Sequence, residues 1–267
     1  MKPSDDLSHF NPEGSLLRRQ QHRMLEMLLV LDEICRRHNI RYWLAAGTLL
    51  GAIRHKGYIP WDDDLDIELL REDYDRLLKI LPAELPDNLQ LQTPETDNGY
   101  FFTYAKLRDR HSRLLETNAY DRIFQMQGIF IDIFPMEREP QWLRWISCRT
   151  LGFCYKVLKR TDLTDDEARQ RVRRIYNINR RFVFPVLKAV SALNPFKRWI
   201  RYSYGIPYND VRLQEWLFPL TTAEFEGHQL PVPHDCEAYL TSKFGNWRQL
   251  PDLSTIHLHA EQLKIED

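Results

Sequence analysis

Hydrophobic residues recur at three- and four-residue steps in some parts of the chain and at alternate positions in others. These two periods are typical of helices and strands respectively. From Leu16 to Cys35 the apolar positions follow the helical period, whereas polar and apolar residues alternate from Asp64 onward. The predicted helices are residues 15–37, 49–55 and 72–81, the last ended by Pro82, and the predicted strands are residues 41–46, 64–70, 89–92, 101–107 and 128–134.

The segment from residue 141 to residue 213 is strongly basic and is expected to be mainly helical up to about residue 200. It contains 16 lysine and arginine residues against 5 aspartate and glutamate residues, a net charge of +11. Arginines between residues 169 and 181 are interleaved with apolar residues, which predicts a helix with an apolar stripe and a basic face. Such a face is either solvated or an electrostatic seat for an anionic substrate polymer or a membrane surface.

Composition as a whole indicates an ordinary globular protein. The 267 residues are 43% hydrophobic and 28% charged with a net charge of −1, so no nucleic-acid partner is expected. The 10 glycines are few, which argues against a glycine-rich phosphate loop. No apolar run approaches the ~18 residues of a membrane-spanning helix, the N-terminus lacks a signal-peptide pattern, and the four cysteines lack paired spacing. We therefore expect a soluble, intracellular protein with reduced thiols.

The strongest chemical signal is the acidic run at residues 62–68, DDDLDIE. Residues two apart share one face of a strand, so Asp64, Asp66 and Glu68 are expected to point the same way. The two aspartates would then lie about 6–7 Å apart, which lets their oxygens converge on hard cations. A solvated acidic turn is the alternative, and the apolar residues between the acids disfavour it. Asp62 shares the same parity, so the metal-binding pair could be shifted by two residues.

A second candidate carboxylate is Asp132, in the apolar run at residues 128–135, GIFIDIFP. It is the one ionisable residue of that run, and burial of an unpaired carboxylate is costly. It is therefore either a third metal ligand, which could also accept the proton of an attacking hydroxyl group, or a structural aspartate paired with an arginine.

Candidate phosphate-binding groups lie near these acids in the sequence. Arg54 ends the short helix before the acidic run, and Lys106 and Arg108 are two apart on a predicted strand and so share a face. Arginine and lysine side chains of this kind bind phosphate oxygens. Gly47 and Thr48 are expected at a helix start, where backbone N–H groups can bind an anion.

Two of these segments together resemble the signature of the LicD family of phosphotransferases, which have the nucleotidyltransferase fold. The resemblance is carried by residues 46–57, AGTLLGAIRHKG, and residues 59–66, IPWDDDLD. Residues 106–109, KLRD, and 128–135 look like the next two blocks of the family. Residues 225–227, FEG, 231–233, PVP, and 239–247 resemble its closing block. The family includes bacterial phosphocholine transferases and the animal fukutin-type ribitol-phosphate transferases.

The resemblance implies an α+β fold, a nucleotidyltransferase-like small mixed β-sheet flanked by helices, here with a largely helical basic insertion. Residues 1–140 would form the catalytic core, residues 141–213 the basic segment and a possible acceptor platform, and residues 214–267 the part that completes the catalytic domain. The resemblance also implies that Asp64, Asp66 and Asp132 bind one or two Mg²⁺ ions, with Mn²⁺ as an alternative. Gly47 and Thr48 would begin the helix that holds the donor phosphates.

The expected reaction is transfer of phosphocholine from CDP-choline to a sugar hydroxyl group of a cell-surface glycan, with release of CMP. The acceptor would be a glycan or lipid-linked glycan of lipooligosaccharide, capsule or teichoic acid type. Asp64, Asp66, Asp132, Arg54 and Lys106 are the expected catalytic residues, with Arg108 on the donor. Another CDP-activated alcohol such as CDP-ribitol or CDP-glycerol, a metal-dependent glycosyltransferase and a non-catalytic scaffold are the alternatives. The expected location is the cytoplasm, with peripheral contact at the inner face of the membrane.

Overall fold

In the computed structural model, the first predicted helix, α1, spans Leu16–Arg37. It begins after Ser15, whose hydroxyl group accepts a hydrogen bond from the backbone N–H of Arg18, as is common at helix starts. The structure describes residues 7–116, 120–193, 198–253 and 260–265. The later helices are α2 (Ala46–His55), α3 (Arg71–Glu84), α4 (Gln141–Leu158), α5 (Asp165–Ile178), α6 (Phe184–Ala192), α7 (Gln214–Leu217) and α8 (Cys236–Phe244), with a 3₁₀ turn η1 (Tyr120–Ile123) and a π-helical turn η2 (Asn179–Val183).

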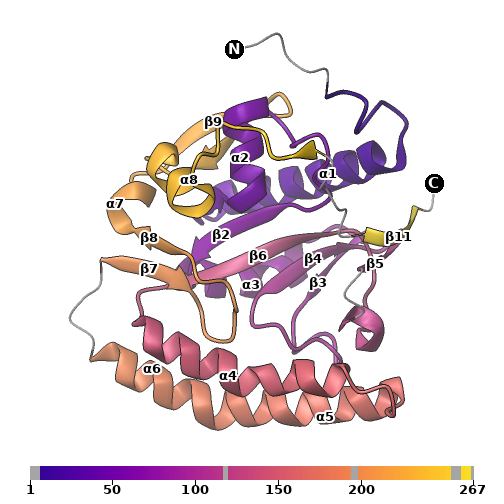
Figure 1. The fold of residues 1–267 in the computed structure, drawn as a ribbon, viewed down its shortest axis with the longest axis vertical. Helices are drawn as coiled ribbons and strands as arrows, with labels where there is room; N and C mark the ends of the chain where they lie inside the picture. The colour runs from indigo at the N-terminus through magenta and orange to yellow at the C-terminus, as the bar shows by residue number, and fades with distance from the viewer. Residues whose placement is uncertain (1–6, 117–119, 194–197, 254–259, 266–267) are drawn as a thin grey trace.

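Strand β6 (Phe130–Glu137) is the centre of a mixed sheet with the order β1–β2–β6–β4–β3, in which β7 pairs with the end of β6 and β8 pairs with β7 (Figure 1). β2 and β6 run parallel, and the other neighbouring strands of this sheet are antiparallel. Its remaining strands are β1 (Trp43–Leu44), β2 (Asp66–Leu70), β3 (Leu89–Gln92), β4 (Ala105–Asp109), β7 (Trp199–Tyr202) and β8 (Val211–Leu213). Two further pairs are β9 (Thr221–Phe225) with β10 (His228–Val232) and β5 (Ser112–Glu116) with β11 (Ala260–Ile265).

Helices cover this sheet in separate groups, which confirms the predicted α+β class (Figure 1). α3 contacts β2, β3 and β6, and α1 contacts β6 and α3. α2 lies against β2 together with α8 and β9. α4, α5 and α6 form a layer at the bottom of the view, where α4 runs beside α5. None of the helices within the described ranges is both long and apolar enough to cross a membrane.

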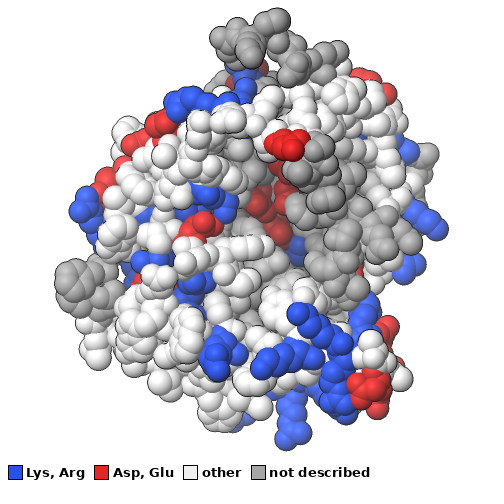
Figure 2. All heavy atoms as spheres, viewed as in Figure 1, with Lys and Arg blue, Asp and Glu red and all other residues white. Residues whose placement is uncertain are grey.

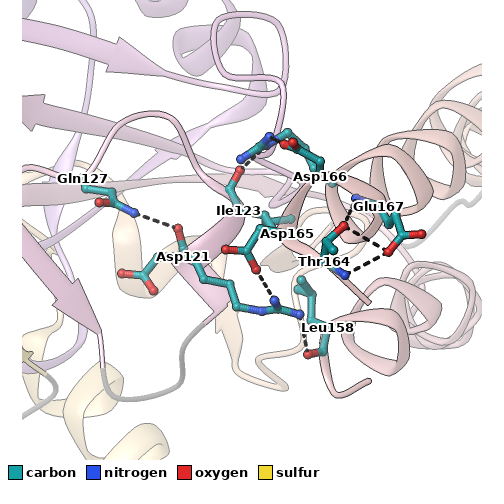
Figure 3. Close-up of polar contacts among 10 residues, drawn as sticks. Asp121, Ile123, Gln127, Leu158, Thr164, Asp165, Asp166 and Glu167 are labelled. Atoms are coloured by element: carbon teal, nitrogen blue, oxygen red, sulfur yellow. Dashed lines mark hydrogen bonds and ion pairs between the residues drawn. The ribbon is translucent and has the colours of Figure 1, made fainter. Parts of the chain in front are cut away.

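The hairpin of α4 and α5 is fixed to the rest of the molecule at its tip (Figure 3). Arg122 of η1 pairs with Asp165 at the start of α5, and its other nitrogen donates to the carbonyl of Leu158 at the end of α4 (3.3 Å). Arg169 of α5 donates in turn to the carbonyl of Ile123 (2.8 Å). Thr164 and Glu167 cap α5 reciprocally, as the capping-box pattern requires.

The turn after α2 is held by the hairpin of β9 and β10. One carboxylate oxygen of Glu226 accepts from the backbone N–H of Tyr58 (3.1 Å), and the other pairs with Arg18 (2.7 Å). A Cβ atom at Gly57 would lie 2.3 Å from the Glu226 carboxylate, so a side chain here would displace that carboxylate from its bonds to Tyr58 and Arg18. The segment that resembles the family's closing block therefore packs directly on the segment that resembles its first block.

Glu68 of β2 is fully buried and is the centre of a polar network that joins distant parts of the chain. It accepts hydrogen bonds from Nε1 of Trp43 (2.9 Å) and from the hydroxyl group of Tyr239 on α8 (3.0 Å), and Arg212 of β8 pairs with it at 3.3 Å. Tyr239 also accepts from the backbone N–H of Ala46, the first residue of α2 (3.2 Å). The network therefore ties β1, β2, α2, β8 and α8 to one buried carboxylate.

Several sequence predictions of element boundaries are wrong. The predicted strand 41–46 is limited to Trp43–Leu44, the helix predicted at 49–55 begins at Ala46, and the strand predicted at 128–134 spans Phe130–Glu137. The helix predicted to end at Pro82 continues to Glu84, because a proline in the last turn removes one hydrogen bond while Leu85 still donates to Leu81 (3.0 Å). The predicted strand 64–70 begins only at Asp66, and the predicted strand 101–107 begins at Ala105. Phe101, Phe102 and Tyr104 instead add their aromatic rings to the core.

The Glu68 network yields a prediction about stability. Replacing Arg212 with Met leaves a fully buried carboxylate without its cation, which should lower the free energy of unfolding by about 3–5 kcal/mol. Urea unfolding followed by circular dichroism measures this change. Arg198→Met, which removes an exposed ion pair with Glu215, is the matched control and should leave the unfolding midpoint close to that of the wild type. Equal losses in the two variants would contradict the importance of the network.

Candidate active site

Three charged side chains lie in a row across adjacent strands of the sheet. In the parallel pairing of β2 with β6, Asp66 is the partner of Asp132. In the antiparallel pairing of β6 with β4, Asp132 is the partner of Lys106. Because paired residues of neighbouring strands point to the same face, the register alone brings two carboxylates and an ammonium group together.

Asp132 forms an ion pair with Lys106, whose Nζ lies 2.9 Å from Oδ1. Both side chains are nearly buried, and the Lys106 ammonium group lies 3.2 Å from the ring centroid of Phe130, a cation–π contact. The sequence left open whether Asp132 pairs with an arginine. The cation is instead Lys106, which was itself one of the predicted site residues.

Further acids surround this row. Burial, followed by the negative charges of Asp64 and Asp66, raises the pKa of the Asp62 carboxyl group well above its usual range. Burial, followed by the charges of Asp64 and Asp132, likewise raises the pKa of Asp66, against the opposing charges of Lys106 and Lys243. The charges of Asp62, Asp64 and Asp66 thus act on one another, and the charge of Asp132 acts on its strand partner Asp66. Figure 2 shows acidic side chains gathered in a hollow near the centre of the face, with basic side chains beside it.

The N-terminus of α2 lies next to these acids, as the sequence predicted for Gly47 and Thr48. A Cβ atom at Gly47 would lie 2.8 Å from Oδ2 of Asp62, so the absence of a side chain lets that carboxylate approach the helix start. The hydroxyl oxygen of Thr48 accepts a hydrogen bond from the backbone N–H of Asp66 (2.9 Å), which fixes α2 to β2. Ala46 has a φ of 45°, an uncommon conformation for a residue with a side chain.

The two predicted arginines occupy different surroundings. Arg54 donates to the carbonyl of Trp247 (2.9 Å) and to Nε2 of His55 (2.8 Å); burial lowers its pKa and the charge of Asp62 raises it. Burial and the neighbouring Arg54 lower the pKa of His55 to about 4, so the imidazole is neutral at pH 7. Arg54 is thus near the acids.

Arg108 is buried two residues beyond Lys106, where it is the cross-strand partner of Phe130. It shares a face with Lys106, as predicted, since both cations contact the ring of Phe130. Its guanidinium group donates to Gln92 (2.6 Å) and to the carbonyl of Gly128 (2.6 Å). These contacts hold the Arg108 side chain inside the protein rather than at the row of acids.

Two residues of the site escaped the sequence analysis. Burial, followed by the charges of Asp132, Asp66 and Asp64, raises the pKa of the Tyr208 phenol, which places this half-exposed tyrosine beside the acids. The positive charge of Lys243 on α8 lowers the pKa of Asp66, and its ammonium group pairs with Asp210 (2.6 Å). Both residues are far from the acidic run in the sequence, and neither belongs to a periodic pattern. For Lys243 the one available signal was its position in a segment that resembles the family's closing block, and for Tyr208 there was none.

The acids have the chemistry that a hard divalent cation requires. They offer carboxylate oxygens, and their crowding in a buried place carries a cost that a cation would remove. Within the described ranges, no three histidine, cysteine, aspartate or glutamate side chains are already arranged to hold a metal ion. Mg²⁺ is commonly bound by one or two carboxylates together with substrate phosphates and water rather than by a closed protein cage. The residues therefore fit an ion that completes its coordination with the substrate.

The fold and the site agree with a defined class of protein. Residues 39–190 match the sequence profile of the family described as LicD/FKTN/FKRP, nucleotidyltransferase domain. This match covers more than half of the chain, so the chain belongs to the LicD family. It is a phosphotransferase.

Individual relatives agree with this assignment. Over 255 residues the chain is 29% identical to the lipopolysaccharide cholinephosphotransferase LicD of Haemophilus influenzae, a similarity that covers 88% of this chain and 92% of that protein. Over 45 residues it is 47% identical to the human ribitol 5-phosphate transferase FKRP, which is 17% of this chain and 9% of that protein. An uncharacterized protein of Rickettsia prowazekii is 56% identical over 59 residues, 22% of each chain.

The crowded acids yield a prediction about pH and stability. The pKa of Asp66 is higher in the folded protein than in the unfolded chain, so the folded protein holds this proton more tightly. The stability of the metal-free protein should therefore fall as the pH rises from the usual aspartate pKa toward the raised pKa of Asp66. Asp66→Asn removes this charge, so it should weaken that pH dependence and raise the melting temperature at neutral pH. A gain of ~1 kcal/mol would correspond to about 2–4 °C for a chain of this size.

Melting curves of both proteins in a chelating buffer, from about pH 5 to about pH 9, provide the measurement. Repeating them with Mg²⁺ should raise the melting temperature of the wild type more than that of the variant. A variant that melts below the wild type at every pH without Mg²⁺ would show that the acids do not repel one another as described.

Proposed function

We propose that this protein transfers phosphocholine from CDP-choline to a sugar hydroxyl group of a cell-surface glycan and releases CMP. The observation that carries the proposal is the row Asp66–Asp132–Lys106 beside the N-terminus of α2, in a chain of the LicD family. The similarity to a lipopolysaccharide cholinephosphotransferase over 88% of the chain supports choline as the donor alcohol. The acceptor would be a lipooligosaccharide, capsule or teichoic acid type of glycan, and the reaction would take place in the cytoplasm.

In this proposal Asp64 and Asp66 bind Mg²⁺, or Mn²⁺, through their carboxylate oxygens, and Asp132 contributes the oxygen opposite the one paired with Lys106. One or two bound ions would neutralise the diphosphate of the donor and hold its two phosphates in place. The backbone N–H groups of Gly47 and Thr48, at the positive end of the α2 dipole, would donate hydrogen bonds to the same diphosphate. Arg54, close to the negative charge of Asp62, supplies a further positive group.

Asp132 accepts the proton of the attacking hydroxyl group. The acceptor oxygen forms a bond to the phosphorus of the phosphocholine group, the bond from that phosphorus to the bridging oxygen breaks, and CMP leaves with that oxygen. Lys106 acts as a positioning residue in this step, since its 2.9 Å ion pair orients the Asp132 carboxylate. The remaining task of the protein is alignment and charge neutralisation, which are the main sources of rate enhancement in phosphoryl transfer.

Ribitol 5-phosphate transfer is the second candidate, and a specific observation favours it. A short segment of this chain is 47% identical to FKRP, and FKRP is described as a ribitol 5-phosphate transferase. The same acids and helix start would serve CDP-ribitol or CDP-glycerol, because the chemistry at phosphorus does not involve the alcohol. Family membership disfavours the glycosyltransferase and scaffold alternatives.

The test is to incubate the purified protein with CDP-choline, CDP-ribitol or CDP-glycerol in the presence of Mg²⁺ and to measure released CMP. We expect CDP-choline to be the preferred donor, and we expect a chelator to stop release. Asp64→Asn and Asp66→Asn should each abolish release while the far-ultraviolet circular dichroism stays unchanged. Preference for CDP-ribitol would favour the second candidate, whereas release of a nucleoside diphosphate from a nucleotide sugar would contradict phosphotransfer altogether.

A separate prediction concerns Asp132. Asp132→Asn should bind CDP-choline with wild-type affinity, since Asp64 and Asp66 remain, yet lose about 10²–10⁴-fold of the turnover rate if Asp132 is the general base. Donor affinity, melting temperature and turnover should be measured on one preparation. The matched control is Asp97→Asn, because Asp97 is a buried structural aspartate that accepts from Gln92 and from the N–H groups of Gln125 and Met126.

The control should melt early and lose activity only in proportion to the unfolded fraction. If Asp132→Asn behaves in the same way, Asp132 is structural. A well-folded Asp132→Asn protein within about twofold of wild-type turnover would show that Asp132 neither accepts the proton nor holds the metal.

A further inference from the structure

Large apolar side chains are exposed on the helical layer of α4, α5, η2 and α6. Of the twelve large hydrophobic residues exposed in the described parts of the chain, eight lie between residues 142 and 193. A soluble protein seldom gathers exposed apolar groups in this way unless they contact something. We call the outward side of this layer, from residue 141 to residue 193, the outer helical surface.

One apolar stripe runs from the last residue of α5 through η2 and α6 to the residue after α6. Its members are spaced by four, four, four and three residues, which places them on the same side of a continuous helix. All are exposed, with Phe182 at 61% and Val186 at 62%. The stripe consists of Ile178, Phe182, Val186, Val190 and Leu193.

A second stripe follows the outward side of α4 and combines aromatic and basic residues. Trp142, Trp145 and Phe153 are each at least half exposed. The guanidinium group of Arg149 lies 5.5 Å from the ring of Trp145, and the ammonium group of Lys156 lies 4.8 Å from the ring of Phe153. Tryptophan and basic residues in this combination are typical of proteins that lie at a membrane–water interface.

The charge of the outer helical surface is strongly positive. Residues 168–193 contain seven lysine and arginine residues and no acid. The acids of the layer lie at residues 162–167, where Asp165 pairs with Arg122, Asp166 pairs with Arg169 and Glu167 caps α5 (Figure 3). They act locally. Beyond them Arg180 pairs with Glu95 (3.7 Å) and Arg173 donates to the carbonyl of Pro94. The rest of the positive charge on this surface is carried by residues such as Arg174, Arg181 and Lys188. Figure 2 shows basic side chains gathered over the lower right of this layer.

An open groove of about 470 Å³ lies where the basic and apolar groups meet. Arg169, Arg173, Arg174 and Arg181 line it together with Ile178 and Phe182. One guanidinium group can donate two parallel hydrogen bonds to the oxygens of a phosphate. The adjacent apolar side chains offer a surface for a hydrocarbon chain. The groove thus has the two chemistries of a phospholipid, an anionic head group and an apolar tail.

We propose that the outer helical surface binds the membrane by contacting anionic phospholipids. Arg174, Arg181 and their neighbours would contact head-group phosphates, while Phe182, Val186 and the tryptophans of α4 would enter the boundary between head groups and acyl chains. The exposed apolar area favours a membrane over an anionic glycan polymer, which would use the charges but not Phe182 or Val186. The inference does not depend on the donor alcohol or on the acid row.

The test measures binding of the full-length protein to sedimented vesicles of phosphatidylcholine alone or with about 30% phosphatidylglycerol, at about 0.1 M NaCl. Wild type should bind the anionic vesicles at least tenfold more tightly than the neutral ones. Lipids with brominated acyl chains should quench its tryptophan fluorescence, because the rings of Trp142 and Trp145 reach the chains.

Two double variants separate the apolar and charged contributions. Phe182→Ser with Val186→Ser should reduce binding about tenfold or more through lost apolar contact, and Arg174→Gln with Arg181→Gln should reduce it by about fivefold per charge. Leu16→Ser on α1 and Lys79→Gln on α3 are the matched controls, since both residues are exposed outside the layer. All these positions are on the surface, so each variant should melt and release CMP like the wild type.

The proposal is overturned if wild type binds both vesicle types equally. It is also overturned if Phe182→Ser with Val186→Ser binds as tightly as wild type and a soluble polyanion such as dextran sulfate competes fully. That second outcome would assign the surface to an anionic polymer. Loss of vesicle binding with unchanged CMP release would support the membrane surface whatever the donor is.

Discussion

The parallel pairing of β2 with β6 is the constraint on which the site depends. It sets Asp66 beside Asp132, and two carboxylates at neighbouring positions on one face repel each other. Much of what surrounds them offsets that repulsion: Lys106 comes from the next strand, Lys243 from α8, and the positive end of α2 from the N-terminal side. The fold tolerates a concentrated negative charge because three separate elements direct positive potential at it.

A second, deeper carboxylate holds these elements in place. Glu68 follows Asp66 on the same face of β2, but it is fully buried and its oxygens accept from Trp43, Tyr239 and Arg212. The strand thus carries two acids in different surroundings. Asp66 is partly exposed among the other acids, whereas the buried Glu68 fastens β8 and α8 to the sheet.

The alternation of polar and apolar residues and the helical period of apolar residues predicted most elements of the first 140 residues. Asp132 was found because it is the one ionisable residue in an apolar strand. What these local patterns omit is register: they place Lys106 and Arg108 on one face without showing that only Lys106 lies opposite Asp132. Tyr208 and Lys243 reach the acids through long-range packing of a loop and a late helix, for which one sequence carries no periodic signal. The roles of the site residues and the division into segments at residues 140 and 213 stay predictions.

The contact between Tyr239 and Ala46 has a consequence for the order in which the protein matures. Strand β2 and helix α2 are complete by residue 70, but the hydroxyl group that accepts the first N–H of α2 and donates to Glu68 belongs to α8. A chain still on the ribosome that has not yet exposed α8 therefore holds the start of α2 without this support. The start of α2 gains this hydrogen bond only when α8 docks, so residues up to about 244 must be synthesised before this arrangement is complete.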